Sequence, residues 1–184
     1  MTETLDDELL VRQFNQGDDS VFDRIVEGNS AAIAVLANRL LGWPGEVEDI
    51  VQDVFLAAFL GLKKFRCECS LKTWLFTITI NKCRSYRYKR MLYIRVFSQA
   101  DAKTSLARAQ AANETSMDSE VFERVRRAVK ALPAKYREPV VLRYLQDLST
   151  NEIAPMLGIS KNALNVRLSR ARERLRQDLA ELIE

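Results

Sequence analysis

Apolar residues recur every three or four positions along almost the whole chain, which is the spacing of one face of an α-helix. Alternating apolar and polar stretches joined by hairpin dipeptides such as Asn-Gly, which indicate β-strands, are missing from the sequence. The pattern therefore predicts an all-α fold.

One segment, residues 98–119, interrupts the helical pattern. Its sequence SQADAKTSLARAQAANETSMDS is small, polar and poor in large apolar side chains, so it can bury little surface to offset the entropy lost on ordering. We expect a flexible linker here. It would join two small helical domains, residues 1–97 and residues 120–184.

Two helices joined by a short turn are predicted near the C-terminus. Ser149 followed by Glu152 has the spacing of a capping box, Gly158 suits the left-handed residue that ends a helix, and Ser160 can cap the next helix. A turn of about three residues that contains glycine is typical of a helix-turn-helix. Pro155 lies inside the first helix, where the missing N–H usually costs about 3 kcal/mol.

The second of these helices separates apolar from polar positions. Its core side is expected to carry Leu164, Leu168, Ala171 and Leu175. The opposite side carries short side chains that can meet base edges in a major groove, namely Asn162, Asn165, Val166 and Ser169. Basic side chains flank them and suit DNA phosphates: Lys161, Arg167, Arg170 and Arg172.

A helix is also predicted from residue 47, after a Pro-Gly turn and with acidic residues in its first turn. One side is apolar. The other mixes acids, an amide and leucines, including Asp49, Gln52, Asp53 and Leu56. The pattern fits a docking surface and fits equally a central helix buried on both sides.

Aromatic and basic residues are interspersed between positions 65 and 95, a combination that suits single-stranded DNA because the rings can stack on bases and the cations can bind the phosphate backbone. Trp74 is expected in the core. The pattern leaves open whether Phe65 and Phe76 belong to the core or to a binding surface.

Composition narrows the class of protein. The 184 residues are 47% apolar and 29% charged, with a net charge of +3, three cysteines and no histidine, which fits a globular protein with reduced thiols and no metal or cofactor site. No run of about 18 apolar residues is long enough to cross a membrane. The acidic start is unlike a signal peptide, so we expect a cytoplasmic protein without direct membrane insertion. The sequence contains no histidine and no glycine-rich phosphate-binding loop, so we do not expect an enzyme.

Three stretches together resemble the extracytoplasmic-function (ECF) sigma factors of bacterial RNA polymerase: VEDIVQDVFLAAF, FRCECSLKTWLFTITINKCRSY and ALPAKYREPVVLRYLQDLSTNEIAPMLGISKNALNVRLSRARERL. The stretches lie between residues 47 and 175 in the family's order, and the resemblance as a whole extends over nearly the whole chain. The resemblance implies a dissociable subunit that directs promoter recognition and opening in transcription initiation. It also implies core RNA polymerase, promoter DNA and an anti-sigma factor as partners.

The resemblance assigns roles to residues of this sequence. Asp49, Gln52 and Asp53, with Leu56 on the same side, would dock on the clamp helices of the largest polymerase subunit. The opened minus-ten strand would meet the loop at residues 66–71 and a set of aromatic, polar and basic side chains: Phe65, Arg66, Phe76, Asn81, Lys82, Arg84 and Arg87. The helix-turn-helix would read the minus-thirty-five element through the side chains named above for it.

Four positions depart from the usual pattern of that family: Pro155, Asp147 where glycine is common, and Cys67 with Cys69 in the base-reading loop. The departures put the promoter sequence in question more than the function. A redox or metal switch at the two cysteines is a minor alternative. The main competing function is a helix-turn-helix regulator that binds duplex DNA without polymerase.

Overall fold

A computed structural model of the chain describes residues 2–41, 47–97 and 117–180. Within these ranges the ordered elements are all helices, which confirms the predicted all-α class. The chain divides into two compact units, residues 1–85 and residues 86–184, and helix α4 contributes to both. Most of the predicted linker lies outside the described residues. Helix α5 begins at Met117, inside the segment predicted as linker.

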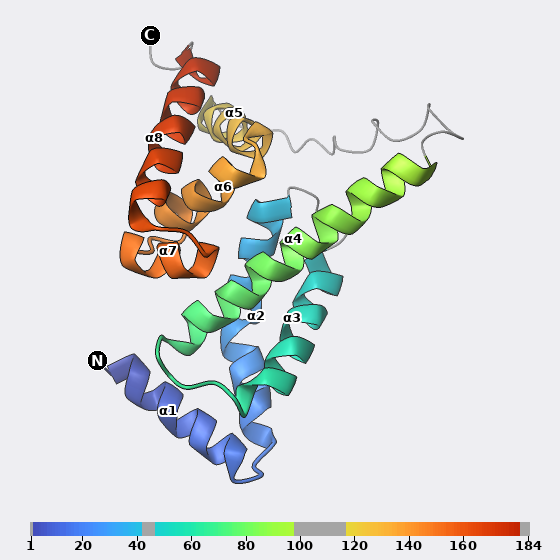
Figure 1. The fold of residues 1–184 in the computed structure, drawn as a ribbon, viewed down its shortest axis with the longest axis vertical. Helices are drawn as coiled ribbons and strands as arrows, with labels where there is room; N and C mark the ends of the chain where they lie inside the picture. Colours follow the sequence, from blue (N-terminus) through green and yellow to red (C-terminus); the bar gives the residue numbers. More distant parts are fainter. Residues whose placement is uncertain (1, 42–46, 98–116, 181–184) are drawn as a thin grey trace. The chain divides into compact units, whose positions relative to one another are not determined.

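The first unit is a small helical bundle (Figure 1). It contains α1 (Thr2–Asn15), α2 (Ser20–Leu41), α3 (Val47–Leu62) and the first half of α4 (Leu71–Phe97). Helices α2 and α3 pack against each other along their apolar sides. The core is closed by side chains that are almost wholly buried, among them Ile33, Leu36, Leu40, Val54, Ala58, Leu75 and Ile80.

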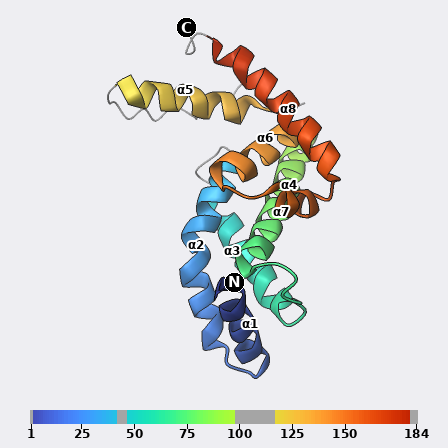
Figure 2. The same cartoon turned by 90° about the vertical axis from the view of Figure 1, so that its left-hand side faces the viewer.

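An aromatic cluster attaches α1, which lies at the lower end of the view in Figure 2, to helices α2 and α3. The ring of Phe14 lies edge-on to Phe59 of α3 at 5.4 Å between centroids, and Phe22 of α2 lies 5.1 Å from the same ring. Such edge-to-face pairs add to the stabilisation from burial alone. The C-terminal half of α1 is therefore held firmly by two other helices.

The second unit carries the predicted helix-turn-helix. After α5 (Met117–Ala131) come α6 (Ala134–Val140) and a π-helical turn (Val141–Leu145), followed by α7 (Thr150–Leu157) and α8 (Lys161–Asp178). Helix α8 packs against both α6 and α7. The two helices α7 and α8 are the predicted pair.

The predicted caps form. The Ser149 N–H donates to Glu152 Oε2 at 2.8 Å, and the Glu152 N–H donates to Ser149 Oγ at 3.3 Å, which completes the capping box. Gly158 ends α7 in the left-handed conformation with φ 66°, and Ser160 Oγ accepts a bond from the Ala163 N–H at 3.2 Å. The turn geometry is thus determined by local hydrogen bonds.

Asp147 also adopts a left-handed backbone, with φ 53°. A Cβ atom makes this conformation costly, whereas glycine adopts it freely. This geometry explains why glycine suits the position.

We expect Asp147→Gly to be more stable than Asp147→Ala by about 1 kcal/mol, because alanine lacks both the freedom of glycine and the local hydrogen bonding of aspartate. The free energy of unfolding would be measured by urea titration. The same pair of substitutions at Arg172, an exposed position inside α8, should show the opposite order. Equal stability of the two variants at position 147 would show that left-handed strain has no influence there.

Candidate nucleic-acid interface

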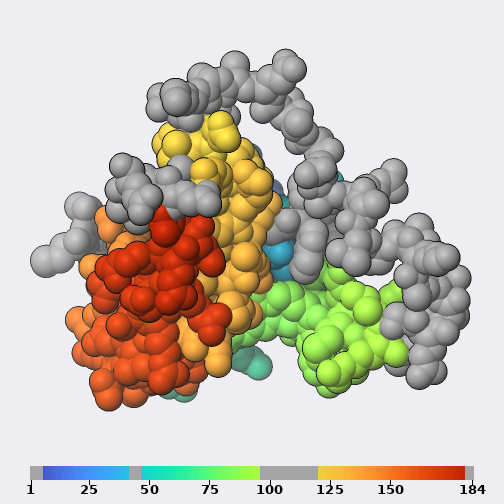
Figure 3. Space-filling model, turned by 90° about the horizontal axis from the view of Figure 1, so that it is seen from above, coloured from blue at the N-terminus to red at the C-terminus, as the bar shows by residue number. Residues whose placement is uncertain are grey.

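The outer face of α8 is the best-formed candidate surface. Leu164, Leu168 and Ala171 are buried as predicted, while Leu175 is half-buried. On the opposite side the four predicted base-reading side chains are all exposed: Asn162, Asn165, Val166 and Ser169. Figure 3 shows α8, in red, on the surface of the second unit beside α5 in yellow. The burial of one side fixes the rotation of the helix, and with it the residues available to DNA.

Val166 is the informative member of this face. Its side chain is 43% exposed on a helix whose other outward positions are mostly polar or charged. The methyl groups of an outward valine can contact a thymine methyl in a major groove, which is compatible with a base-reading role for this face.

The predicted phosphate-binding residues flank this face. Lys161, Arg170 and Arg172 are exposed, and Arg167 is half-buried. They lie on both sides of the base-reading positions, so the helix can contact two strands of a groove.

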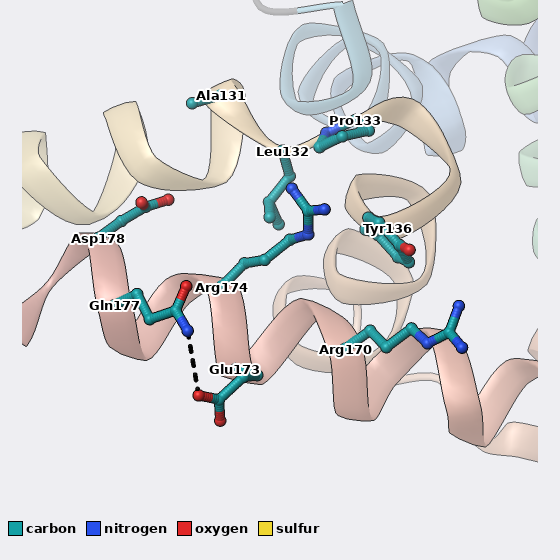
Figure 4. A pocket seen from close by; sticks show the side chains of 9 residues that line it. All are labelled: Ala131, Leu132, Pro133, Tyr136, Arg170, Glu173, Arg174, Gln177 and Asp178. Carbon is teal, nitrogen blue, oxygen red and sulfur yellow. Dashed lines mark hydrogen bonds between the residues drawn. The ribbon is translucent and has the colours of Figure 1, made fainter.

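A cavity of about 590 Å³ lies beside this flank, between α8 and the turn from α5 to α6 (Figure 4). Lys135 and Arg174 place their cationic groups 5.0 Å and 5.2 Å from the centre of the Tyr136 ring. A hydrogen bond with Arg170 lowers the pKa of Tyr136, and the positive charge of Lys135 acts in the same direction against an opposing effect of burial. The flank of α8 next to α6 therefore carries several cationic groups, together with the carboxylates of Glu173 and Asp178.

The outer face of α3 is exposed over the predicted docking positions. Asp49, Gln52, Asp53 and Leu56 all lie in the open, and Leu60 extends the same face. Of the two readings left open by the sequence, a helix buried on both sides is wrong for this unit. Ile50, Val54, Phe55 and Ala58 form the buried side.

Asp53 also contacts the helix that follows. Its Oδ2 atom lies 3.6 Å from Lys82 Nζ, so one acid of the α3 face is paired with one predicted strand-binding base on α4. The pair is exposed enough that water and salt weaken it. Lys82 therefore remains available to a phosphate.

The loop between α3 and α4 is short and polar. Phe65, at its start, stacks on Trp74 with 4.8 Å between ring centroids and an interplanar angle of 27°. Both rings are half-buried, so Trp74 is less deeply placed than predicted. Arg66 is 84% exposed and lies 3.9 Å from Glu68, a weak contact. Asn81, which lies on α4, is exposed.

Phe76 requires a correction. Its ring is 1% exposed and belongs to the core of the first unit, with Lys72 Nζ 5.7 Å from its centroid. A base cannot stack on a ring that is fully covered by its own protein. The prediction that Phe76 meets the opened strand is wrong for this conformation.

Arg84 and Arg87 lie on α4 and are half-buried. Both already take part in polar or electrostatic interactions. Any contact with a phosphate must compete with these interactions.

The loop cysteines Cys67 and Cys69 are free thiols in this structure. Burial is the main cause that raises the pKa of Cys67, followed by the negative charges of Glu8 and Asp7. Burial, then the charge of Glu68, raises the pKa of Cys69. In the part of the chain that the structure describes, no three potential ligands gather into a metal site. These thiols lack the low pKa that marks a reactive cysteine.

One contact in this region was not anticipated from the sequence. The Leu71 N–H donates to Asp7 Oδ2 at 2.7 Å, joining α1 to the start of α4 (Figure 1). The acidic start of the chain is visible in the sequence, but no sequence signal identifies the partner of Asp7.

We expect Cys67 and Cys69 to react with iodoacetamide at pH 7 several-fold more slowly than a cysteine in an unfolded peptide. A raised pKa leaves less thiolate at neutral pH, so the rate should still be rising above pH 9, the ordinary thiol value. Mass spectrometry of chains carrying Cys83→Ala with Cys67→Ser or Cys69→Ser isolates each thiol. A rate that levels off below pH 9 would contradict the assignment.

None of the helices in the described ranges is both long enough and apolar enough to pass through a bilayer.

Comparison with known proteins agrees with this arrangement. Residues 25–91 match the family described as Sigma-70 region 2, and residues 122–175 match Sigma-70, region 4. The chain is 30% identical to the ECF RNA polymerase sigma factor SigW of Bacillus subtilis (strain 168) over 180 residues, which covers 94% of this chain and 96% of that protein.

Two solved structures share the fold. The structure of CnrH in complex with the cytosolic domain of CnrY has a TM-score of 0.68 at 29% identity and covers 95% of this chain and 97% of that one. The sigma factor RpoE in complex with the anti-sigma factor NepR from Bartonella quintana has a TM-score of 0.69 at 28% identity, covering 86% and 96%. Full-length similarity, both region matches and the exposed helix-turn-helix lead to one assignment: the chain belongs to the ECF sigma factors of bacterial RNA polymerase.

Proposed function

We propose that the two units of this sigma factor divide promoter recognition between them. The second unit reads the minus-thirty-five element as duplex DNA through α8. The first unit docks on core polymerase and, together with the part of α4 that follows Ser85, holds the opened minus-ten strand. The observation that carries the proposal is the outer face of α8, where exposed amide, hydroxyl and valine side chains follow a doubly capped turn.

Contacts of α8 fall into two chemical classes. Asn162, Asn165, Val166 and Ser169 read base edges. Lys161, Arg167, Arg170 and Arg172 bind phosphates and fix the register, with the cationic flank near Tyr136 supporting this role for Arg170.

Docking on polymerase uses the α3 face. Asp49, Gln52 and Asp53 offer carboxylate and amide groups to basic and polar partners on the clamp helices, and Leu56 supplies an apolar contact. Exposure of these side chains, and of Leu60 beside them, supports a protein contact here.

The opened minus-ten strand lies along the α3–α4 loop and the outer side of α4. The members of this set are Phe65, Arg66, Asn81, Lys82, Arg84 and Arg87, with Phe76 removed because it is buried. The exposure of Arg66 and Asn81 supports their direct contact with the DNA strand. The arginines of α4 would interact with the negative charge of the strand's phosphates.

The chain itself performs no chemistry in this scheme; the polymerase forms the RNA. It acts in the cytoplasm, where the polymerase and chromosome are. An anti-sigma factor restrains it, a proposal supported by the sigma factor RpoE, which was solved with the anti-sigma factor NepR, and by CnrH, which was solved with the cytosolic domain of CnrY.

The experiment that tests this function adds the purified chain to sigma-free core polymerase and fragmented genomic DNA of the source bacterium. We expect RNA starts that share a bipartite upstream sequence and vanish without the chain. A stand-alone regulator would instead bind duplex DNA tightly, show no affinity for core polymerase and yield no such starts.

Docking predicts a charge-specific loss of affinity. Reversing two acids, Asp49→Arg with Asp53→Arg, should weaken core binding by about tenfold or more, since like charges then face a basic partner. Asp23→Arg with Glu27→Arg reverses two exposed acids on α2, which is the same charge change on another helix, and should alter affinity by less than about twofold. Fluorescence anisotropy of the labelled chain with core polymerase measures both. Equal losses would remove α3 from the interface.

Readout by α8 predicts two distinct phenotypes. Asn165→Ala should relax preference at one base pair of the minus-thirty-five element by about 1 to 3 kcal/mol. Arg172→Ala should weaken binding to all sequences alike and reduce the salt slope by about one unit. Competition titrations with single-base variants at several salt concentrations separate the two. If both substitutions behave identically, the division between base and phosphate contacts is incorrect.

A further inference from the structure

We propose that Asp7 is a positioning residue for the α3–α4 loop: its carboxylate fixes the end of the loop and so presets the shape in which residues 66–70 meet the opened strand. The inference rests on the proposed strand-binding function of the first unit. It starts from the 2.7 Å hydrogen bond that the Leu71 N–H donates to Asp7 Oδ2, between residues 64 positions apart in the sequence.

The bond satisfies a donor that the helix cannot satisfy itself. Helix α4 begins at Leu71, whose N–H is one of the first four without a partner inside the helix. Ser70 Oγ already accepts from the Thr73 N–H at 3.1 Å. Leu71 is 3% exposed, so water has little access if the carboxylate is removed. A negative charge at this end of a helix also interacts favourably with the helix dipole.

Asp7 is carried by a firmly held element. Further along α1, Val11 and Phe14 are buried, and Phe14 packs against Phe22 and Phe59. Both views of the ribbon place the N-terminal part of α1 beside the loop (Figures 1 and 2). The carboxylate is thus presented from a packed helix to the loop end.

The other end of the loop is held separately. Phe65 stacks on Trp74. The Trp74 ring itself lies close to Gly61, where a Cβ atom would be only 3.2 Å from Trp74 Cζ2. Between the two attachments Cys67 has φ 54°, a backbone conformation that a non-glycine residue keeps only when its surroundings impose it. The loop is therefore shaped by contacts at both ends.

The middle of the loop is free to meet a ligand. Arg66 and Glu68 are 84% and 78% exposed, and their mutual contact is long. Beyond the larger effect of burial, the Asp7 charge contributes to the raised pKa of both loop thiols, which agrees with its place beside the loop. A loop ordered in advance loses less entropy when it binds a flexible strand. Releasing its Asp7 end should therefore weaken strand binding while the α3 and α8 surfaces keep their own partners.

The test compares holoenzymes that carry Asp7→Ala, Asp7→Asn or the neighbouring exposed control Asp6→Ala. The probe is a fluorescent single-stranded oligonucleotide with the minus-ten sequence that wild-type holoenzyme selects from a randomised pool. Hydrogen exchange of the Leu71 amide in the full chain reports the contact itself. We expect Asp7→Ala to speed this exchange and to lower strand affinity by about fivefold to tenfold, with core and duplex affinities within about twofold of wild type.

Asp7→Asn keeps an oxygen that can accept the bond and should recover most of the strand affinity, while Asp6→Ala should match wild type. Unchanged Leu71 exchange in Asp7→Ala, or faster exchange with unchanged strand affinity, would overturn the inference. An equal loss of core affinity would also overturn it, because the effect would then be general unfolding. If wild-type holoenzyme itself selects no strand, the proposed function fails, and that result is visible without any variant.

Discussion

The functional surfaces of this protein depend on one constraint: a helix in a small unit buries one side and must leave the other exposed. Burial of Leu164, Leu168 and Ala171 fixes the rotation of α8 about its axis. The same rule applied to α3 buries Ile50 and Val54 and leaves its acidic and amide residues outside. The positions of apolar residues therefore decide which polar residues can meet DNA or polymerase.

Hydrogen bonds at helix ends determine the conformation of the turns and loops, where few apolar side chains are available to pack. Ser149, Glu152 and Ser160 set the angle of the turn before α8. Ser70 and Asp7 do the same at the start of α4. Both candidate DNA-binding elements thus begin beside a well-satisfied helix N-terminus, which gives loops of polar residues a defined shape without a large buried surface.

The sequence predicted the features that are local. The capping box, the glycine stop and the buried side of α8 each depend on residues within about two turns of one another, so periodicity and spacing were sufficient. Phe76 was misassigned because an aromatic residue at helical spacing fits a core as well as a surface, and only packing decides. The Asp7 contact could not be predicted, because its partner is 64 residues away in the sequence. That partner is a backbone N–H, a group that nearly every residue has, so the residue type at position 71 does not indicate it. The left-handed backbone at residue 67 could not be predicted either, because the residue there is cysteine and not the glycine that usually indicates such a conformation.

Each unit binds its own DNA segment, so one promoter should be contacted by both units at once. The direct measurement attaches an iron chelate that cleaves DNA locally to Val166→Cys or to Glu68→Cys, in a chain whose own cysteines are replaced, and maps strand cleavage in the open complex with core polymerase. We predict cleavage centred on the minus-thirty-five element from position 166 and on the minus-ten element from position 68. Cleavage at one shared region from both positions, or cleavage that does not require core polymerase, would contradict the account.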